Sequence, residues 1–371
     1  MFAGKKYLLG LAAGLAVLAG GQAIAQERVL KVTNWAEYLD EESITKFEEE
    51  YGIDVIYDYY DSVEAMDSKL LAGNSGYDLV THSSSSAARL IKAGNILQPL
   101  DKSKLSNMGN YDPEIMKQLS ELWDPGNQYI MPYMWGSHGV TYNKELVLET
   151  NPDAPIGSLD LIFDPDEIAK IAPCGVSLLD SPGDVVPMAL SYLGFDPNST
   201  NPDDYHKVGE LFAKIRPHIK TFDNYAYQRM PQKEFCVAVT WGPDGLLAMS
   251  GAEEAGTGVV LDFFLPPGEN AAQLWVDGWM IPADAENVDD AHLFIDFFAR
   301  PEIAAADSNF TWYATANKAA KDQGLIDEAV TSSPAAFPTP DQVALMYTVD
   351  VLPPKIERLQ TRVWTDFKAG N

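Results

Sequence analysis

Basic residues, histidine and cysteine are all scarce in this sequence. Its 371 residues include 26 Lys or Arg but 54 Asp or Glu, which gives a formal net charge of −28. An acidic surface of this kind repels nucleic acids and anionic lipids, so neither is expected as a partner. The five histidines are scattered and form no pair at metal-ligand spacing, so we expect no metal site. Nothing in the sequence implies a cofactor.

Long apolar runs are also missing, except at the N-terminus. Lys5 and Lys6 precede an apolar stretch at 7–20, and the residues up to Ala25 fit the small-residue rule for cleavage. The stretch is shorter than a membrane span requires. We therefore expect residues 1–25 to be a signal peptide that is cleaved after Ala25, and the mature protein to be free in an exported compartment.

Only two cysteines are present, Cys174 and Cys236, and both lie in the exported portion. An isolated pair in an oxidising compartment predicts one disulfide. Neither cysteine has a partner at ligand spacing, which argues against a zinc site.

Common catalytic motifs are missing as well. The sequence contains no G-x-S-x-G, H-E-x-x-H, Walker A loop or G-x-G-x-x-G. Together these absences favour binding over catalysis. Carboxylates among aromatic residues would also suit a glycosidase, so a secreted carbohydrate-active enzyme is a distant alternative.

The pattern that is present alternates strands with helices. Strand-type runs occur at 29–33, 53–60, 77–81, 175–179 and 235–240. Between the first two, Ile44 and Phe47 recur at helical spacing, and Gly52 is expected to end the helix. Such alternation implies mainly parallel sheets covered on both faces, and the chain length suggests two α/β lobes.

Ligands of open parallel sheets bind beyond the carboxyl ends of the strands. The predicted exits carry mainly aromatic residues and carboxylates: Trp35, Glu37 and Tyr38 after the first strand, Ser83 after the third, and Asp180, Asp184, Trp241, Asp244, Trp275 and Asp277 farther along. No exit offers Lys or Arg. Aromatic faces attract cations and cover methylenes, and carboxylates accept hydrogen bonds from ammonium groups. The inventory predicts a small aliphatic cation, with ammonium groups at one or both ends.

Each of these residues also has a structural interpretation. A single Trp after a strand is more often part of the core, and Asp184 or Asp244 taken alone could be a helix N-cap. Ser83 could equally cap the helix that it precedes. The functional interpretation depends on the recurrence of two residue types at several exits.

At these same residues the chain resembles the periplasmic polyamine-binding proteins, the spermidine/putrescine solute receptors of ABC importers. The segment "NWAEY" resembles the "NW-[ST]-[DE]-Y" segment of that family. Further similar stretches are "GYDLVTHS", "LQPLDKSKL", "MPYMWGSHGVTYN", "GFDPNST", "IPADAEN" and "ANKAA". The likeness covers nearly the whole mature chain, and several of these stretches are distinctive.

The resemblance implies a type II periplasmic binding protein fold with the ligand between two lobes. It implies a pocket lined from one lobe by Trp35, Ala36, Glu37, Tyr38, Ser83, Trp275 and Asp277, and from the other lobe or hinge by Asp184, Trp241, Asp244 and Tyr313. Asp180 matches an acid used by spermidine-binding members. The cysteines fall where putrescine-type members carry a disulfide, which favours that branch.

The implied protein is a monomeric periplasmic receptor. It would capture a diamine or polyamine, with putrescine as the favoured ligand, and pass it to an inner-membrane ABC permease. The expected lobes are residues 26–136 with 261–301, and residues 137–260 with 302–371. Three residues depart from the family pattern: Ala36 lacks a hydroxyl, Asp184 is a methylene shorter than the usual Glu, and Trp275 is bulkier than Phe. The departures leave spermidine or another organic cation as alternative ligands.

Overall fold

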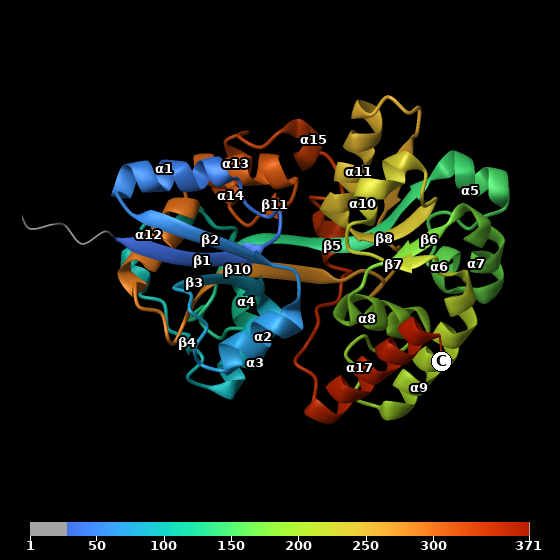
Figure 1. Ribbon diagram of the computed structural model, residues 1–371, viewed down its shortest axis with the longest axis horizontal. Coiled ribbons are helices and arrows are strands. Elements are labelled where there is room, and N and C mark those ends of the chain that lie inside the picture. The colour runs from blue at the N-terminus through green and yellow to red at the C-terminus, as the bar shows by residue number, and fades with distance from the viewer. Residues whose placement is uncertain (1–27, 371) are drawn as a thin grey trace, which may run out of the picture.

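The longest strand, β5 (Met131–Asn143), runs through the middle of the molecule and joins two groups of elements (Figure 1). The computed structural model describes residues 28–370, so the expected signal peptide lies outside the described residues. The first half of β5 pairs antiparallel with β10 (Leu274–Pro282), and its second half pairs antiparallel with β8 (Val237–Trp241). The sheet order is β2-β1-β3-β10-β5-β8-β6-β7.

The first group contains the N-terminal strands and a return of the chain. Its other strands are β1 (Val29–Trp35), β2 (Asp54–Tyr60), β3 (Leu79–Ser83), β4 (Leu97–Gln98) and β11 (Ala314–Thr315). Its helices are α1 (Glu41–Tyr51), α2 (Val63–Leu71), α3 (Ser84–Ala93), α4 (Pro113–Leu122), α12 (Val288–Phe298), α13 (Pro301–Thr311) and α14 (Lys318–Asp322). The strands β1, β2 and β3 are parallel, whereas β10 is antiparallel to β3.

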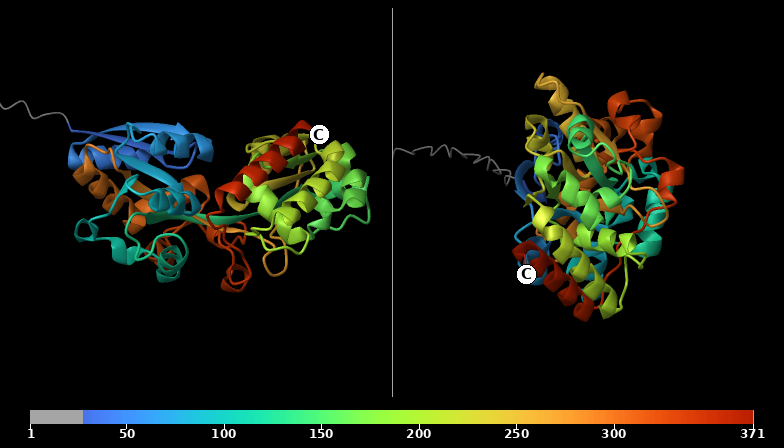
Figure 2. Two further views of the ribbon diagram at one scale, coloured as in Figure 1. Left: turned by 90° about the horizontal axis from the view of Figure 1, so that it is seen from below. Right: turned by 90° about the vertical axis from the view of Figure 1, so that its right-hand side faces the viewer.

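The second group lies at the other end of β5 (Figure 2). Its strands are β6 (Val176–Leu178), β7 (Thr221–Phe222), β8 and β9 (Leu261–Phe264). Its helices are α5 (Lys144–Thr150), α6 (Asp160–Phe163), α7 (Pro165–Ile171), α8 (Pro182–Tyr192), α9 (Pro202–Ile215), α10 (Ala226–Arg229), α11 (Gly242–Glu254) and, after α15 (Glu328–Thr331) and α16 (Pro340–Val343), the C-terminal α17 (Pro354–Ala369). β6 is parallel to both β7 and β8.

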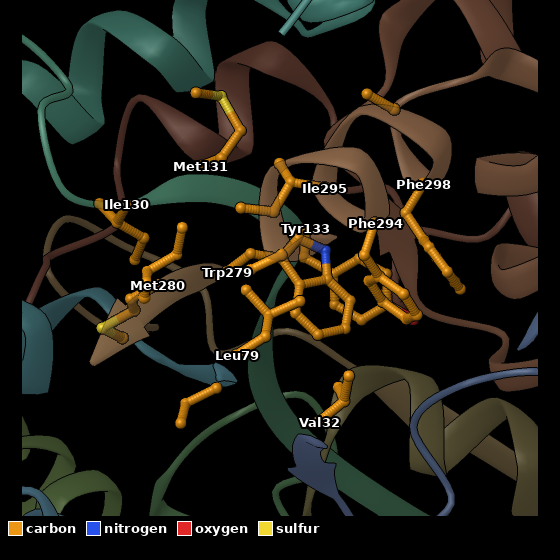
Figure 3. Packing of buried hydrophobic residues seen from close by; sticks show 14 of the residues in the cluster. Val32, Leu79, Ile130, Met131, Tyr133, Trp279, Met280, Phe294, Ile295 and Phe298 are labelled. Carbon is orange, nitrogen blue, oxygen red and sulfur yellow. The ribbon is translucent and has the colours of Figure 1, made fainter. Parts of the chain in front are cut away.

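Each group has its own large hydrophobic core. In the first, Trp279 is fully buried between Tyr133 of β5 and the stacked rings of Phe294 and Phe298 on α12 (Figure 3). In the second, α17 packs against α9, with the rings of Phe212 and Phe367 stacked. Two separate cores explain why the molecule divides into two lobes, since each lobe buries apolar surface without the other.

Local sequence signals account for the first βαβ unit. Asp40 caps α1 by accepting a hydrogen bond from the backbone N–H of Glu42, and Gly52 ends the helix with φ at 61°. The helical spacing places Ile44 and Phe47 against the core. The predicted strand, helix and stop signal are all confirmed here.

The predicted disulfide between Cys174 and Cys236 is present, with the two Cα atoms 5.5 Å apart. Cys236 also donates its backbone N–H to the carbonyl of Gly175, so the bond joins the turn before β6 to the start of β8. Within residues 28–370, no helix is both long enough and apolar enough to cross a membrane.

Two segments, β9 and α13, do not pack with the lobe to which the sequence analysis assigned them. β9 pairs with β5 at Val140 to Asn143, in the second lobe. α13 follows α12 and contacts α1, and Ile303 and Tyr313 belong to the first core.

Candidate functional site

The end of β1 and the loop after it place two aromatic rings and one acid near the middle of the molecule. Trp35 is the last residue of β1, and its ring centroid lies 4.3 Å from that of Tyr60 on β2. Glu37 has φ at 56°, a left-handed conformation that is uncommon for a residue with a side chain. This turn directs Tyr38 inward, where its ring meets that of Tyr313 edge-on at 4.8 Å.

Trp275 and Asp277 lie inside β10, not after a strand as predicted. The sequence analysis assumed a parallel sheet, but β10 is antiparallel to β3, and Asp277 pairs with Ser83 at the end of β3. The start of β10 therefore reaches the sheet edge where the parallel strands end. Trp275 and Asp277 therefore lie at the predicted edge of the sheet, although β10 runs in the direction opposite to the one predicted.

Gly136 makes room for the Trp275 ring. A Cβ atom at this position would lie only 2.7 Å from Cζ2 of Trp275. The ring of Trp275 is half-buried, and its centroid lies 5.8 Å from that of Tyr313. Trp275 and Tyr313 thus form one continuous aromatic wall with Tyr38.

Asp277 is buried beside this wall, with 8% of its surface exposed. Burial raises the pKa of the Asp277 carboxyl to about 7, and the neighbouring charge of Asp184 adds to the rise. Tyr38 and Trp35 favour the ionised form and offset part of this effect. A cation beside Asp277 would restore the ionised state, because an opposite charge lowers a carboxyl pKa.

Asp244 forms a second buried carboxyl on the first turn of α11. One of its oxygens, Oδ1, accepts a hydrogen bond from the hydroxyl of Tyr313 at 2.8 Å. Burial raises the pKa of Asp244 to about 7, and the charge of Glu37 contributes to the increase. Asp244 is thus not the N-cap of α11, where Trp241 precedes the helix without a side-chain cap.

Glu37 reaches the second lobe through a residue that the sequence analysis missed. Its Oε2 accepts a hydrogen bond from the hydroxyl of Tyr227 on α10 at 2.6 Å. Tyr227 lies in a four-residue helix without a periodic pattern and follows no strand exit. No sequence signal identified it.

Replacing Tyr227 by Phe is expected to weaken ligand affinity about three- to tenfold, because the loop that carries Tyr38 loses a charge-assisted hydrogen bond. Titration of the Phe variant with putrescine measures this change. Replacing Tyr225 by Phe is the matched control, since that tyrosine has no comparable bond to Glu37. Equal affinities for the two variants would contradict a role for the Tyr227 hydroxyl.

Asp184 lies in the first turn of α8, after the cap position Ser181. The charge of Asp184 raises the pKa of Asp277, and it opposes the lowering of the His138 pKa and adds to the raising of the Tyr347 pKa. His138 is completely buried, and this burial lowers the pKa of its imidazole. The sequence analysis also missed His138 and Tyr347, which meet only through the folded chain.

Three further predicted residues, Trp241, Ser83 and Ala36, have contacts of other kinds. Trp241 ends β8, opposite His138. Ser83 accepts a hydrogen bond from the backbone N–H of Ser86, so it acts as the cap of α3. The backbone N–H of Ala36 donates to the carbonyl of Tyr60 at 3.2 Å.

Asp180 differs from the other predicted acids because it has a basic partner. Both of its carboxylate oxygens accept hydrogen bonds from the ammonium of Lys368 on α17, at 2.7 and 2.5 Å. This carboxylate already has a cation partner within the protein. The pairing partner lies 188 residues away in the sequence, so spacing gave no indication of it.

No group of His, Cys, Asp or Glu among residues 28–370 is arranged to hold a metal ion. In the same part of the chain, none of the ion pairs involves Glu37, Asp184, Asp244 or Asp277. These four acids come from both lobes, and within the described part of the chain none of them has a basic side chain to balance its charge.

Comparison with known proteins gives a consistent result. Residues 42–339 match the family described as bacterial extracellular solute-binding protein. The chain is 40% identical over 370 residues to the putrescine-binding periplasmic protein PotF of Escherichia coli (strain K12), which covers 99% of this chain and 98% of that protein. It is 41% identical over 367 residues to the putrescine-binding periplasmic protein SpuD of Pseudomonas aeruginosa (strain UCBPP-PA14), with 98% of each chain covered.

Among solved structures, a putative spermidine/putrescine ABC transporter from Listeria monocytogenes superposes with a TM-score of 0.81 at 32% identity, over 93% of this chain and all of that chain. The predicted two-lobed fold class and the resemblance to polyamine receptors are confirmed by these similarities.

Proposed function

The chain belongs to the family of bacterial extracellular solute-binding proteins, and we propose that it captures putrescine between its two lobes for an ABC importer. The observation that carries this proposal is the set of four acids without a basic partner, two of them buried beside aromatic rings. Buried carboxylates need a counter-charge, and an ammonium supplies both charge and hydrogen-bond donors. The family is one of binding proteins, so the prediction of a receptor and not an enzyme is confirmed.

In the proposed complex, Asp277 and Asp244 accept hydrogen bonds from the two ammonium groups, and Glu37 and Asp184 add negative charge. Trp35, Trp275 and Tyr38 cover the methylenes, each buried CH₂ contributing about 0.8 kcal/mol. The bulk of Trp275 favours a short chain, and the relatives at 40% and 41% identity are named for putrescine. Asp180 is left out of this set because Lys368 neutralises it.

Calorimetric titration of ligand-stripped protein with putrescine, cadaverine, spermidine and spermine tests the proposal. We expect putrescine to bind most tightly. Tighter binding of spermidine would select the alternative polyamine. The absence of heat with all four amines would exclude a polyamine ligand.

We place the lobe boundaries by packing, and they differ from those expected at β9 and α13. The first lobe comprises residues 28–135 and 274–337, and the second comprises residues 138–264 and 352–370. Residues 265–273 and 338–351 cross between them and pair with each other, since Tyr347 donates its N–H to the carbonyl of Ala272 and accepts from the N–H of Leu274. These crossings and the middle of β5 form the proposed hinge, which closes over the ligand.

One ion pair bridges the proposed lobes away from the ligand. A guanidinium nitrogen of Arg89 on α3 donates to Glu357 on α17 at 2.8 Å, and Arg89 is also held by Asp67. Both partners are partly exposed, so the pair contributes little and is screened by salt. Replacing Glu357 by Gln is expected to accelerate putrescine dissociation about two- to fivefold.

Stopped-flow measurement of dissociation checks this expectation. Replacing Asp366 by Asn on the same helix removes an equal charge and serves as control, because Asp366 takes part in none of the ion pairs within residues 28–370. If both variants release putrescine at the rate of the unmodified protein, the bridge does not hold the closed form.

The relatives are periplasmic proteins by their names, and we propose the same location for this chain. Cleavage after Ala25, a monomeric state and docking on an inner-membrane permease are parts of the same proposal. Mass spectrometry of the exported protein tests the cleavage site, because the mature chain is expected to begin at Gln26.

A further inference from the structure

Asp307 is a fully buried acid behind the wall formed by Tyr38. It lies on α13, and none of the ion pairs of the described chain involves it. Its Oδ2 is 2.8 Å from the hydroxyl oxygen of Tyr133, and its Oδ1 accepts a hydrogen bond from the backbone N–H of Asp40 at 3.2 Å. Asp307 thus contacts the loop that presents Glu37 and Tyr38 directly at Asp40, and indirectly, through Tyr133, at Tyr38.

The hydroxyl of Tyr133 has two acceptors but only one hydrogen. It lies 2.9 Å from the carbonyl oxygen of Tyr38 and 2.8 Å from Oδ2 of Asp307. A tyrosine hydroxyl donates one hydrogen bond and can accept others. Both short contacts are satisfied together when Tyr133 donates to the Tyr38 carbonyl and a protonated Asp307 donates to the Tyr133 oxygen.

We propose, on the basis of the function proposed above, that Asp307 is a positioning residue that works in its protonated form and fixes the Tyr38 wall through Tyr133. The chain of hydrogen bonds runs from α13 through β5 to the carbonyl of Tyr38. The second contact, to the N–H of Asp40, fixes the chain two residues after Tyr38, where the loop enters α1. The left-handed turn at Glu37 requires such support, because strained backbone persists only where neighbouring contacts hold it.

The surroundings of Asp307 support a neutral carboxyl. Burial raises the pKa of Asp307 to about 8 and outweighs the contacts with Tyr133, the Asp40 N–H and Ser43, which favour the ionised form. The nearby charge of Asp40 adds to the increase. The other titratable groups that face it are Tyr133 and Tyr57, and burial raises the pKa of each above its ordinary value. Neither tyrosine therefore titrates where Asp307 does.

Ionisation of Asp307 would leave the Tyr133 hydrogen shared between two acceptors, and the carboxylate would attract it more strongly than the carbonyl. The Tyr38 carbonyl then loses its short hydrogen bond from Tyr133 and keeps only the longer one, at 3.5 Å, from Nδ2 of Asn34. The competent form of the site becomes less populated. At pH 9 about a tenth of Asp307 is protonated, so the dissociation constant is expected to rise about tenfold. Asp307→Asn keeps a donor for Tyr133 and an acceptor for Asp40 but does not titrate.

The test compares putrescine affinity of the unmodified protein, Asp307→Asn and Asp307→Ala between about pH 7 and pH 9. We expect Asp307→Asn to bind like the unmodified protein at pH 7 and about tenfold more tightly than it at pH 9. Comparison at each pH cancels the titration of the ligand and of the other acids. Parallel pH profiles of the unmodified protein and Asp307→Asn, or equal losses in Asp307→Asn and Asp307→Ala at pH 7, would overturn the proposal.

Two measurements need no ligand and separate this proposal from the proposed function. The infrared difference spectrum between the unmodified protein and Asp307→Asn at neutral pH should contain the C=O stretching band of one protonated carboxyl. Asp244 and Asp277 contribute to both spectra and cancel in the difference. Stability gives the same information: the contribution of Asp307 is fully present below its unfolded pKa of about 4 and is lost as the pH rises through about 8. Asp307→Asn should therefore gain thermal stability relative to the unmodified protein over that range. An unchanged carboxyl band would contradict the protonated state whether or not putrescine binds.

Discussion

Replacing Asp277 by Asn is expected to weaken putrescine binding about 100-fold. Removing one partner of a buried, hydrogen-bonded charge pair costs about 2–5 kcal/mol, because the other charge stays desolvated without its partner. Asp277 is buried and has no basic partner among residues 28–370, so the ligand ammonium would depend on it. The fold should tolerate the change, since Asn has the same shape and the buried carboxyl is costly to ionise.

Calorimetric titration of the Asn variant measures the loss. Asp180→Asn is the matched control, because it removes the same charge from an acid that is paired with Lys368. We expect the control to change affinity less than twofold. A loss in Asp180→Asn as large as that in Asp277→Asn would mean that the ligand occupies a different position.

Putrescine affinity is expected to fall by up to about 10,000-fold between pH 8 and pH 5, about 100-fold for each of two carboxyls. The carboxyls of Asp277 and Asp244 have pKa values of about 7 in the free protein, because burial disfavours their ionised forms. A bound ammonium favours ionisation, so binding below pH 7 must release protons. Each carboxyl then costs about tenfold in affinity per pH unit below 7. The ligand itself stays protonated over this range, since alkyl ammonium groups titrate near pH 10.

The same shifts determine the stability of the ligand-free protein. Both carboxyls have raised pKa values in the folded state, so their contribution to stability is fully present below pH 4 and is lost as the pH rises through 7.

Titration at pH 6 in buffers of different ionisation enthalpy measures proton release on binding. Binding without proton release, together with equal affinity at pH 5 and pH 8, would contradict the proposed role of these carboxyls.

The elements of the first lobe were predictable because their signals are local. The helical spacing of Ile44 and Phe47, and the stop at Gly52, describe α1 without information from elsewhere in the chain. Strand exits likewise located Trp35 and Tyr38, because the rule for open sheets depends only on the order of strands and helices.

The rest of the site depends on contacts between distant segments. Tyr227 meets Glu37 only after the two lobes are placed together, and His138 meets Asp184 across two elements of the second lobe. The direction of β10 was also unpredictable. A strand-type sequence does not indicate whether the strand will be parallel or antiparallel to its neighbour in the sheet. Gly136 contributes only by leaving space for the Trp275 ring, and nothing in the sequence pattern indicates such a role.

The most direct test of the central claim is a crystal structure of the protein with putrescine. The proposed arrangement predicts one ammonium within about 3 Å of Asp277, the other near Asp244, and the methylenes between the rings of Trp35 and Trp275. Putrescine bound outside this set of residues, or a site that excludes it at saturating concentration, would contradict the account.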